Sequence, residues 1–197
     1  MGILTRLYGK ETRGDHMILF INACVRAGSR TKRIADAYLA KVSEPVTEVK
    51  LEDIAFPVTD EDFLRKRDSL IAGGRFSDPM FSLARQFAEA DRIVIAAPYW
   101  DLSFPAVLKQ YFEHINVLGI TFEYTREGYP RGLCRAEDLC YITTAGGNYC
   151  PEEFGFGYVK ALAQNFYGIK EVRQIKATGL DIAGADVEGI IEEALQK

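Results

Sequence analysis

Residues 17–32 read MILFINACVRAGSRTK, and this stretch decides the fold. Residues 17–23 form a continuous apolar strand with Asn22 at its end, which is typical of a strand that is buried on both faces. A polar loop follows, and the helical spacing of Ile34, Ala35, Tyr38 and Leu39 predicts a helix over 31–41. A buried strand that leads through a loop into a helix is the repeating unit of parallel α/β sheets.

The same alternation continues to the end of the chain. Further strands are expected at 46–51, 92–97, 139–144 and 172–178, and further helices at 80–90, 156–166 and 185–196. Ser103 is expected to cap a helix that runs to Ile115, with Pro105 in its first turn. Residues 52–78 are charged and are expected to mix a short helix with loops. No internal repeat or linker divides the chain.

Five strands separated by helices predict a doubly wound parallel sheet with helices on both faces. Ligands of such sheets bind beyond the carboxyl ends of the strands, at the point where the strand order reverses. The site is therefore expected in the loops after the first, third and fourth strands. Those loops begin at Asn22, Ala97 and Thr144.

The first loop has the chemistry of a phosphate site. Ser29, Arg30 and Thr31 place two hydroxyls and a guanidinium at a helix N-terminus, where free N–H groups and the helix dipole favour anions. The loop matches neither the P-loop nor the G-x-G-x-x-G dinucleotide pattern. The alternative is that Ser29 only caps the helix.

The other two loops suit a flat ring. Pro98, Tyr99 and Trp100 place large planar side chains where a loop should meet solvent, although they could instead pack under a neighbouring loop. Gly146 and Gly147 let the backbone approach a ligand closely, although they could also form an ordinary turn. Together the three loops match one ligand, with phosphate at the first loop and a ring at the other two.

Several segments resemble the flavin-dependent NAD(P)H:quinone reductases and azoreductases. The resemblance covers about residues 17–180 and is carried by residues 98–102, 108–112, 119–125, 29–31 and 144–147. It implies a flavodoxin-like fold with strand order 2-1-3-4-5, non-covalent FMN, a homodimer, and hydride transfer from NADH or NADPH to quinone, azo or nitro acceptors. No side chain is expected to act as the catalytic group, because the chemistry belongs to the flavin.

The resemblance also assigns roles to individual residues. The implied phosphate contacts are Ser29, Arg30 and Thr31, and the implied ring contacts are Pro98, Tyr99, Trp100, Asp101, Leu102, Thr144, Ala145, Gly146 and Gly147. Two positions depart from the family pattern. Ala23 stands where a hydroxyl is frequent, and Asp101 stands where Asn is common. An acidic group beside the ring would disfavour the reduced anion.

Composition narrows the remaining possibilities. The 197 residues are 48% hydrophobic with a net charge of −4 and no basic run, which disfavours a nucleic-acid partner. The four cysteines form no C-x-x-C pair, which favours reduced thiols in the cytoplasm and no metal site. No apolar run has the length of a membrane span. Residues 1–16 are expected to lie outside a domain formed by 17–197.

Two further residues, Cys24 and His114, are of types that often carry function. Cys24 is expected to be a buried, inert thiol and not a redox group. His114 is expected on the helix surface and not in proton delivery. The main alternatives to a reductase are a flavodoxin-type electron carrier and a flavin-binding module without turnover. The long segments 52–78 and 121–135 exceed what a carrier needs, which favours an enzyme with a small-molecule acceptor.

Overall fold

A computed structural model of the chain describes residues 16–196, so the expectation for 1–16 falls almost wholly outside the described residues. Five parallel strands form the main sheet in the order β2-β1-β3-β6-β7. They are β1 Ile18–Asn22, β2 Val46–Lys50, β3 Arg92–Ala96, β6 Asp138–Thr144 and β7 Glu171–Ala177. In chain order this is the predicted arrangement 2-1-3-4-5, which is confirmed.

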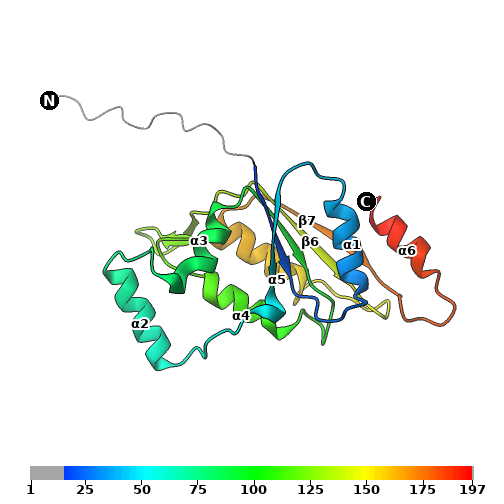
Figure 1. Ribbon diagram of the computed structural model, residues 1–197, viewed down its shortest axis with the longest axis horizontal. Coiled ribbons are helices and arrows are strands. Elements are labelled where there is room, and N and C mark those ends of the chain that lie inside the picture. Colours follow the sequence, from blue (N-terminus) through cyan, green and yellow to red (C-terminus); the bar gives the residue numbers. More distant parts are fainter. Residues whose placement is uncertain (1–15, 197) are drawn as a thin grey trace.

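Helices cover both faces of this sheet (Figure 1). One face carries α1 Arg30–Leu39 and α6 Val187–Ala194, and the other carries α3 Ser82–Glu89, α4 Ala106–Ile115 and α5 Phe156–Leu162. The alternation of β1 explains both layers, because Leu19 belongs to the core under α3–α5 while Phe20 belongs to the core under α1 and α6. Between residues 16 and 196, no helix is both long and apolar enough to cross a bilayer.

The segment between β2 and α3 is a helix flanked by short turns, in agreement with the prediction for residues 52–78. It contains η1 Leu51–Asp53, α2 Glu61–Ala72 and η2 Pro79–Phe81. The Asp60 carboxylate caps α2 by accepting the N–H of Phe63 at 2.9 Å. Figure 1 shows α2 at the margin of the molecule, away from the sheet.

The insert after α4 forms a small hairpin that was not predicted from the sequence pattern. Strands β4 Phe122–Tyr124 and β5 Pro130–Gly132 pair antiparallel. The hairpin packs against η3 Ala163–Tyr167, a π-helical turn that continues α5. Gly132 makes this contact possible, since a Cβ there would lie 2.1 Å from the Tyr167 carbonyl carbon.

The expected cap of α4 is wrong. The helix begins at Ala106, Pro105 occupies the position before it, and no side chain caps it. The Ser103 hydroxyl instead donates to the Phe154 carbonyl at 2.6 Å. Residues 100–103 close into a tight turn, which directs Ser103 toward the loop before α5 and away from the helix end.

His114 is not the solvated surface residue that the helix pattern predicted. Its ring lies 4.9 Å from the ring of Phe56 and 5.2 Å from the ring of Phe63, measured between centroids. Its Nε2 atom is buried without a hydrogen-bond partner among the described residues. The segment between β2 and α2 covers this part of α4. The periodicity of α4 alone cannot predict that another segment covers His114.

Candidate functional site

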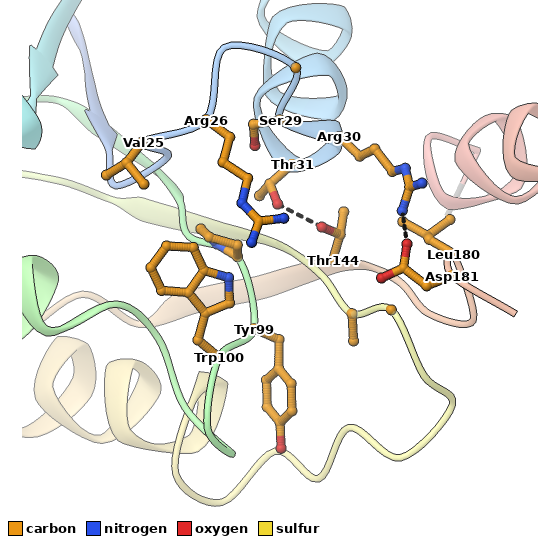
Figure 2. Close-up of a pocket in the computed structure, with 14 residues that line it drawn as sticks. Val25, Arg26, Ser29, Arg30, Thr31, Tyr99, Trp100, Thr144, Leu180 and Asp181 are labelled. Atoms are coloured by element: carbon orange, nitrogen blue, oxygen red, sulfur yellow. Dashed lines mark hydrogen bonds and ion pairs between the residues drawn. The ribbon is translucent and has the colours of Figure 1, made fainter.

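A cavity of about 420 Å³ opens at the carboxyl ends of β1, β3 and β6, where the strand order reverses (Figure 2). Its volume lies within the range of about 300–1,000 Å³ that is usual for small-molecule sites. The lining residues are Val25, Arg26, Gly28, Ser29, Arg30, Thr31, Pro98, Tyr99, Trp100, Thr144, Ala145, Gly146, Leu180 and Asp181.

Most of the residues singled out from the sequence meet in this cavity. Those that line it are Ser29, Arg30, Thr31, Pro98, Tyr99, Trp100, Thr144, Ala145 and Gly146. Asp101, Leu102 and Gly147 do not line it, and the side chains of Asp101 and Leu102 are exposed. The acidic side chain that does line the cavity is Asp181, which follows β7.

The turn at Asp101 and Leu102 explains their absence from the cavity. The backbone N–H groups of Trp100 and Ser103 donate to each other's carbonyls at 3.0 and 2.8 Å. The two residues between them have φ values of +49° and +68°, which are rare for residues with side chains. This is the geometry of a two-residue turn, and it projects Asp101 and Leu102 away from the sheet.

The N-terminus of α1 forms one end of the cavity. The Ser29 hydroxyl accepts the N–H of Lys32 at 3.3 Å, so Ser29 caps the helix and also lines the cavity. The Thr31 and Thr144 hydroxyls are hydrogen-bonded to each other at 2.7 Å and are buried. Two hydroxyls have two protons and use one between them, so one donor remains for a ligand.

Two arginines from the first loop reach this end of the cavity. Arg30 donates from Nη1 to the Asp181 Oδ1 atom at 2.6 Å. The guanidinium carbon of Arg26 lies 6.0 Å from the centroid of the Trp100 ring, within reach of a cation–π contact. Figure 2 shows the guanidinium of Arg26 pointing into the cavity and that of Arg30 pointing toward Asp181.

Trp100 and Tyr99 form the opposite wall. Burial raises the pKa of the Tyr99 hydroxyl, which keeps it protonated at neutral pH. The oxygen is buried and has no hydrogen-bond partner among residues 16–196. In Figure 2 the Tyr99 side chain points away from the arginines, while Trp100 lies beneath Arg26.

Five lining residues were not predicted from the sequence: Val25, Arg26, Gly28, Leu180 and Asp181. The first three belong to the loop already identified, and the charge of Arg26, four residues before Arg30, was an available signal. Leu180 and Asp181 follow β7. These two residues reach the cavity because the backbone N–H of Asp181 donates to the Gly146 carbonyl at 2.9 Å. No sequence pattern predicts this hydrogen bond.

Cys24 is the buried, inert thiol that the sequence predicted. It is 5% exposed, and its Sγ–H donates to the Ala96 carbonyl at 3.7 Å. Burial raises the pKa of the thiol, which keeps it in the unreactive protonated form. In the part of the chain that the structure describes, no three His, Cys, Asp or Glu side chains are grouped so as to hold a metal.

A doubly wound sheet with strand order 2-1-3-4-5 and a cavity at its switch point defines a flavodoxin-like protein. The family model described as "Flavodoxin-like fold" matches residues 16–197.

Sequence relatives carry more specific names. An FMN-dependent NADH:quinone oxidoreductase of Clostridium beijerinckii is 38% identical over 91% of this chain and 94% of its own length. A protein of the same name from Lachnoclostridium phytofermentans is 39% identical, with the same coverage of both chains. The crystal structure of an azoreductase from Bacillus anthracis is 26% identical, covers 91% of this chain and 95% of its own, and has a TM-score of 0.79. The chain belongs to the flavodoxin-like family that includes these oxidoreductases.

Proposed function

We propose that this chain is an FMN-dependent NADH:quinone oxidoreductase that also accepts azo or nitro compounds. The observation that carries the proposal is one cavity that brings together hydroxyl and guanidinium groups beside the α1 N-terminus and the aromatic side chains of Tyr99 and Trp100. The names of the two bacterial relatives support FMN as cofactor and NADH as hydride donor. NADPH remains an alternative donor for the test below.

The donors around the α1 N-terminus fit the phosphate of FMN. Ser29, Thr31 and the two arginines offer hydroxyl and guanidinium hydrogen bonds, and the helix dipole favours negative charge at this end. We assign Arg26 to this set beside Arg30, since Arg26 has no ion pair with the described residues. The predicted contacts of Ser29, Arg30 and Thr31 with phosphate stay part of this proposal.

The other end of the cavity fits a flat ring. Pro98, Tyr99 and Trp100 would line one side of it, with Thr144, Ala145 and Gly146 on the other. When bound, FMN supplies the ring that accepts hydride and passes electrons on. The chain's own residues would orient that ring and keep water from its edges.

The decisive experiment uses the purified protein with bound flavin. We expect a yellow protein that releases FMN on heating, and we expect NADH to bleach it without any protein partner. A small quinone should restore the colour, and the cycle should repeat. Reduction by dithionite but not by NADH or NADPH would favour the electron-carrier alternative. Recovery of FAD, or of no flavin after reconstitution, would overturn the cofactor assignment.

We also propose that the chain forms a homodimer with the cavity near the interface. The apolar face of α4, which suggested this from the sequence, is a weak argument, because Leu108, Tyr111, Phe112 and Ile115 pack in the chain's own core. Stronger support comes from exposed apolar side chains of loops near the cavity. They are Val25, Leu102, Tyr149, Phe154 and Ile182. A monomer in light scattering at micromolar concentration would refute the dimer.

A cytoplasmic location is proposed from the thiols. Cys24, Cys134, Cys140 and Cys150 are all free in the structure, which fits a reducing compartment.

A further inference from the structure

The two arginines at the cavity have different partners. Arg30 forms an ion pair with Asp181 at 2.6 Å, whereas the guanidinium of Arg26 makes no hydrogen bond or ion pair with the described residues and lies 6.0 Å from the centroid of the Trp100 ring. Arg30 comes from the first turn of α1, and Asp181 comes from the loop that follows β7. The positive charge of Arg30 is therefore already balanced by a carboxylate of the chain itself.

The Asp181 carboxylate occupies space at the cavity wall. A Cβ built on Gly146 would lie 2.2 Å from the Asp181 Oδ2 atom, so the carboxylate covers Gly146 directly. Its backbone is held there by hydrogen bonds to the loop after β6, from the N–H of Asp181 to the Gly146 carbonyl and from the N–H of Gly179 to the Gly147 carbonyl. The carboxylate thus lies between Arg30 and Gly146, both of which line the cavity, and Figure 2 shows its ion pair with Arg30.

This ion pair is suited to exchange. The side chains of Arg30 and Asp181 are 38% and 69% exposed, and exposed ion pairs contribute little to stability. A phosphate group offers a guanidinium more acceptor oxygens and more charge than one carboxylate does. Breaking the ion pair with Asp181 therefore requires little free energy, and Arg30 gains a stronger partner in the phosphate.

We propose that Asp181 is an exchangeable counter-ion of Arg30. The carboxylate holds Arg30 when no phosphate is bound, and Arg30 leaves Asp181 when the phosphate end of the cofactor enters. Asp181 therefore lowers the affinity for phosphate-bearing flavin more than the affinity for flavin without phosphate. This inference rests on the proposed function, because it takes FMN as the ligand.

The test measures dissociation constants of the flavin-free protein by quenching of flavin fluorescence. Asp181→Asn is expected to bind FMN roughly fivefold more tightly, with a clearly smaller change in the dissociation constant of riboflavin. Asn is expected to be tolerated, since Asp181 is exposed. Glu188→Gln is the matched control, because it breaks the ion pair of Glu188 with Arg33, one turn further along α1. Glu188→Gln should change neither the dissociation constant of FMN nor that of riboflavin.

The same substitution in an Arg30→Ala variant separates competition for Arg30 from general repulsion between the Asp181 carboxylate and the phosphate. In Arg30→Ala, removal of the Asp181 charge should no longer tighten FMN, because the partner for which the two anions compete is gone. If Asp181→Asn still increases the affinity for FMN in the Arg30→Ala variant, the proposal is overturned. An equal change for FMN and riboflavin, or no change for FMN in Asp181→Asn, would also overturn it.

Inorganic phosphate tests the same exchange without flavin. Line broadening of the phosphorus NMR signal should show tighter phosphate binding to Asp181→Asn than to the wild type. That result, in a protein that fails to bind FMN, would support the exchange and refute the proposed function. Phosphate binding that is equal in the two proteins would overturn the exchange.

Discussion

The hydroxyl oxygens of Thr31 and Thr144 lie 2.7 Å apart in a buried hydrogen bond. The two side chains are 1% and 9% exposed. Thr31 belongs to the first turn of α1 and Thr144 ends β6, so this bond joins the proposed phosphate loop to the proposed ring loop. The two loops that would hold opposite ends of one ligand are fixed relative to each other before any ligand binds.

A double-mutant cycle tests this link. Thr31→Val or Thr144→Val should each lower the free energy of unfolding by about 1–3 kcal/mol, because each leaves a buried hydroxyl without its partner. The double variant should lower the free energy of unfolding by much less than the sum of the two single losses, since both polar groups are then gone. Urea unfolding of the flavin-free protein measures all three. Additive losses would show that the bond does not couple the loops.

The contact between the hairpin and η3 depends on Gly132. Gly132→Ala should lower stability by roughly 1–3 kcal/mol, because the new Cβ would meet the backbone of Tyr167 and Gly168, which cannot rotate away. Gly147→Ala is the control, since a Cβ there meets nothing within 4 Å. Thermal unfolding compares the two. Equal melting temperatures would contradict the close approach at Gly132.

Strain in the turn after Trp100 should be relieved by glycine. Leu102 has a φ of +68° and is 45% exposed, so Leu102→Gly removes an unfavourable backbone conformation with little loss of packing. We expect the free energy of unfolding to rise by up to about 1 kcal/mol, with part of the gain offset by the entropy of glycine in the unfolded chain. Leu102→Ala keeps the Cβ and should bring no gain. A stability loss in Leu102→Gly would locate the strain elsewhere.

Asp91 should make stability depend on pH. Burial by itself raises the pKa of its carboxyl, but the hydrogen bond from the Met17 N–H at 2.8 Å and the ion pair with Arg135 at 2.7 Å outweigh burial and lower it. The folded state therefore favours the ionised form, so this contribution is present above the unfolded-state pKa of about 3.9 and is lost as the pH falls through the folded-state value.

Asp91→Asn should destabilise the protein by roughly 1–3 kcal/mol at pH 7 and by progressively less below about pH 4. Urea unfolding across this pH range measures the difference from the wild type. Asp36→Asn, which removes the exposed partner of Lys32, is the control and should be nearly neutral at every pH. A difference for Asp91→Asn that stays constant down to pH 2 would contradict the assignment.

The sequence by itself determined the sheet and the place of the cavity. The apolar run at 17–21 that ends at Asn22 is typical of a strand covered on both sides, and helical spacing after it leads the chain back across the sheet. Because parallel strands end at one edge, the loops that begin at Asn22, Ala97 and Thr144 had to meet there. Local periodicity and strand direction are enough for these conclusions.

Only the tertiary structure decided which side chains face the cavity and what they touch. Arg30 meets Asp181 across 151 positions and Thr31 meets Thr144 across 113, and each contact depends on how neighbouring loops pack. Asp101 and Leu102 turn away because of a backbone conformation that their residue types do not favour. Periodicity reports which face of an element is apolar, whereas these contacts depend on distances between elements that are far apart in the chain.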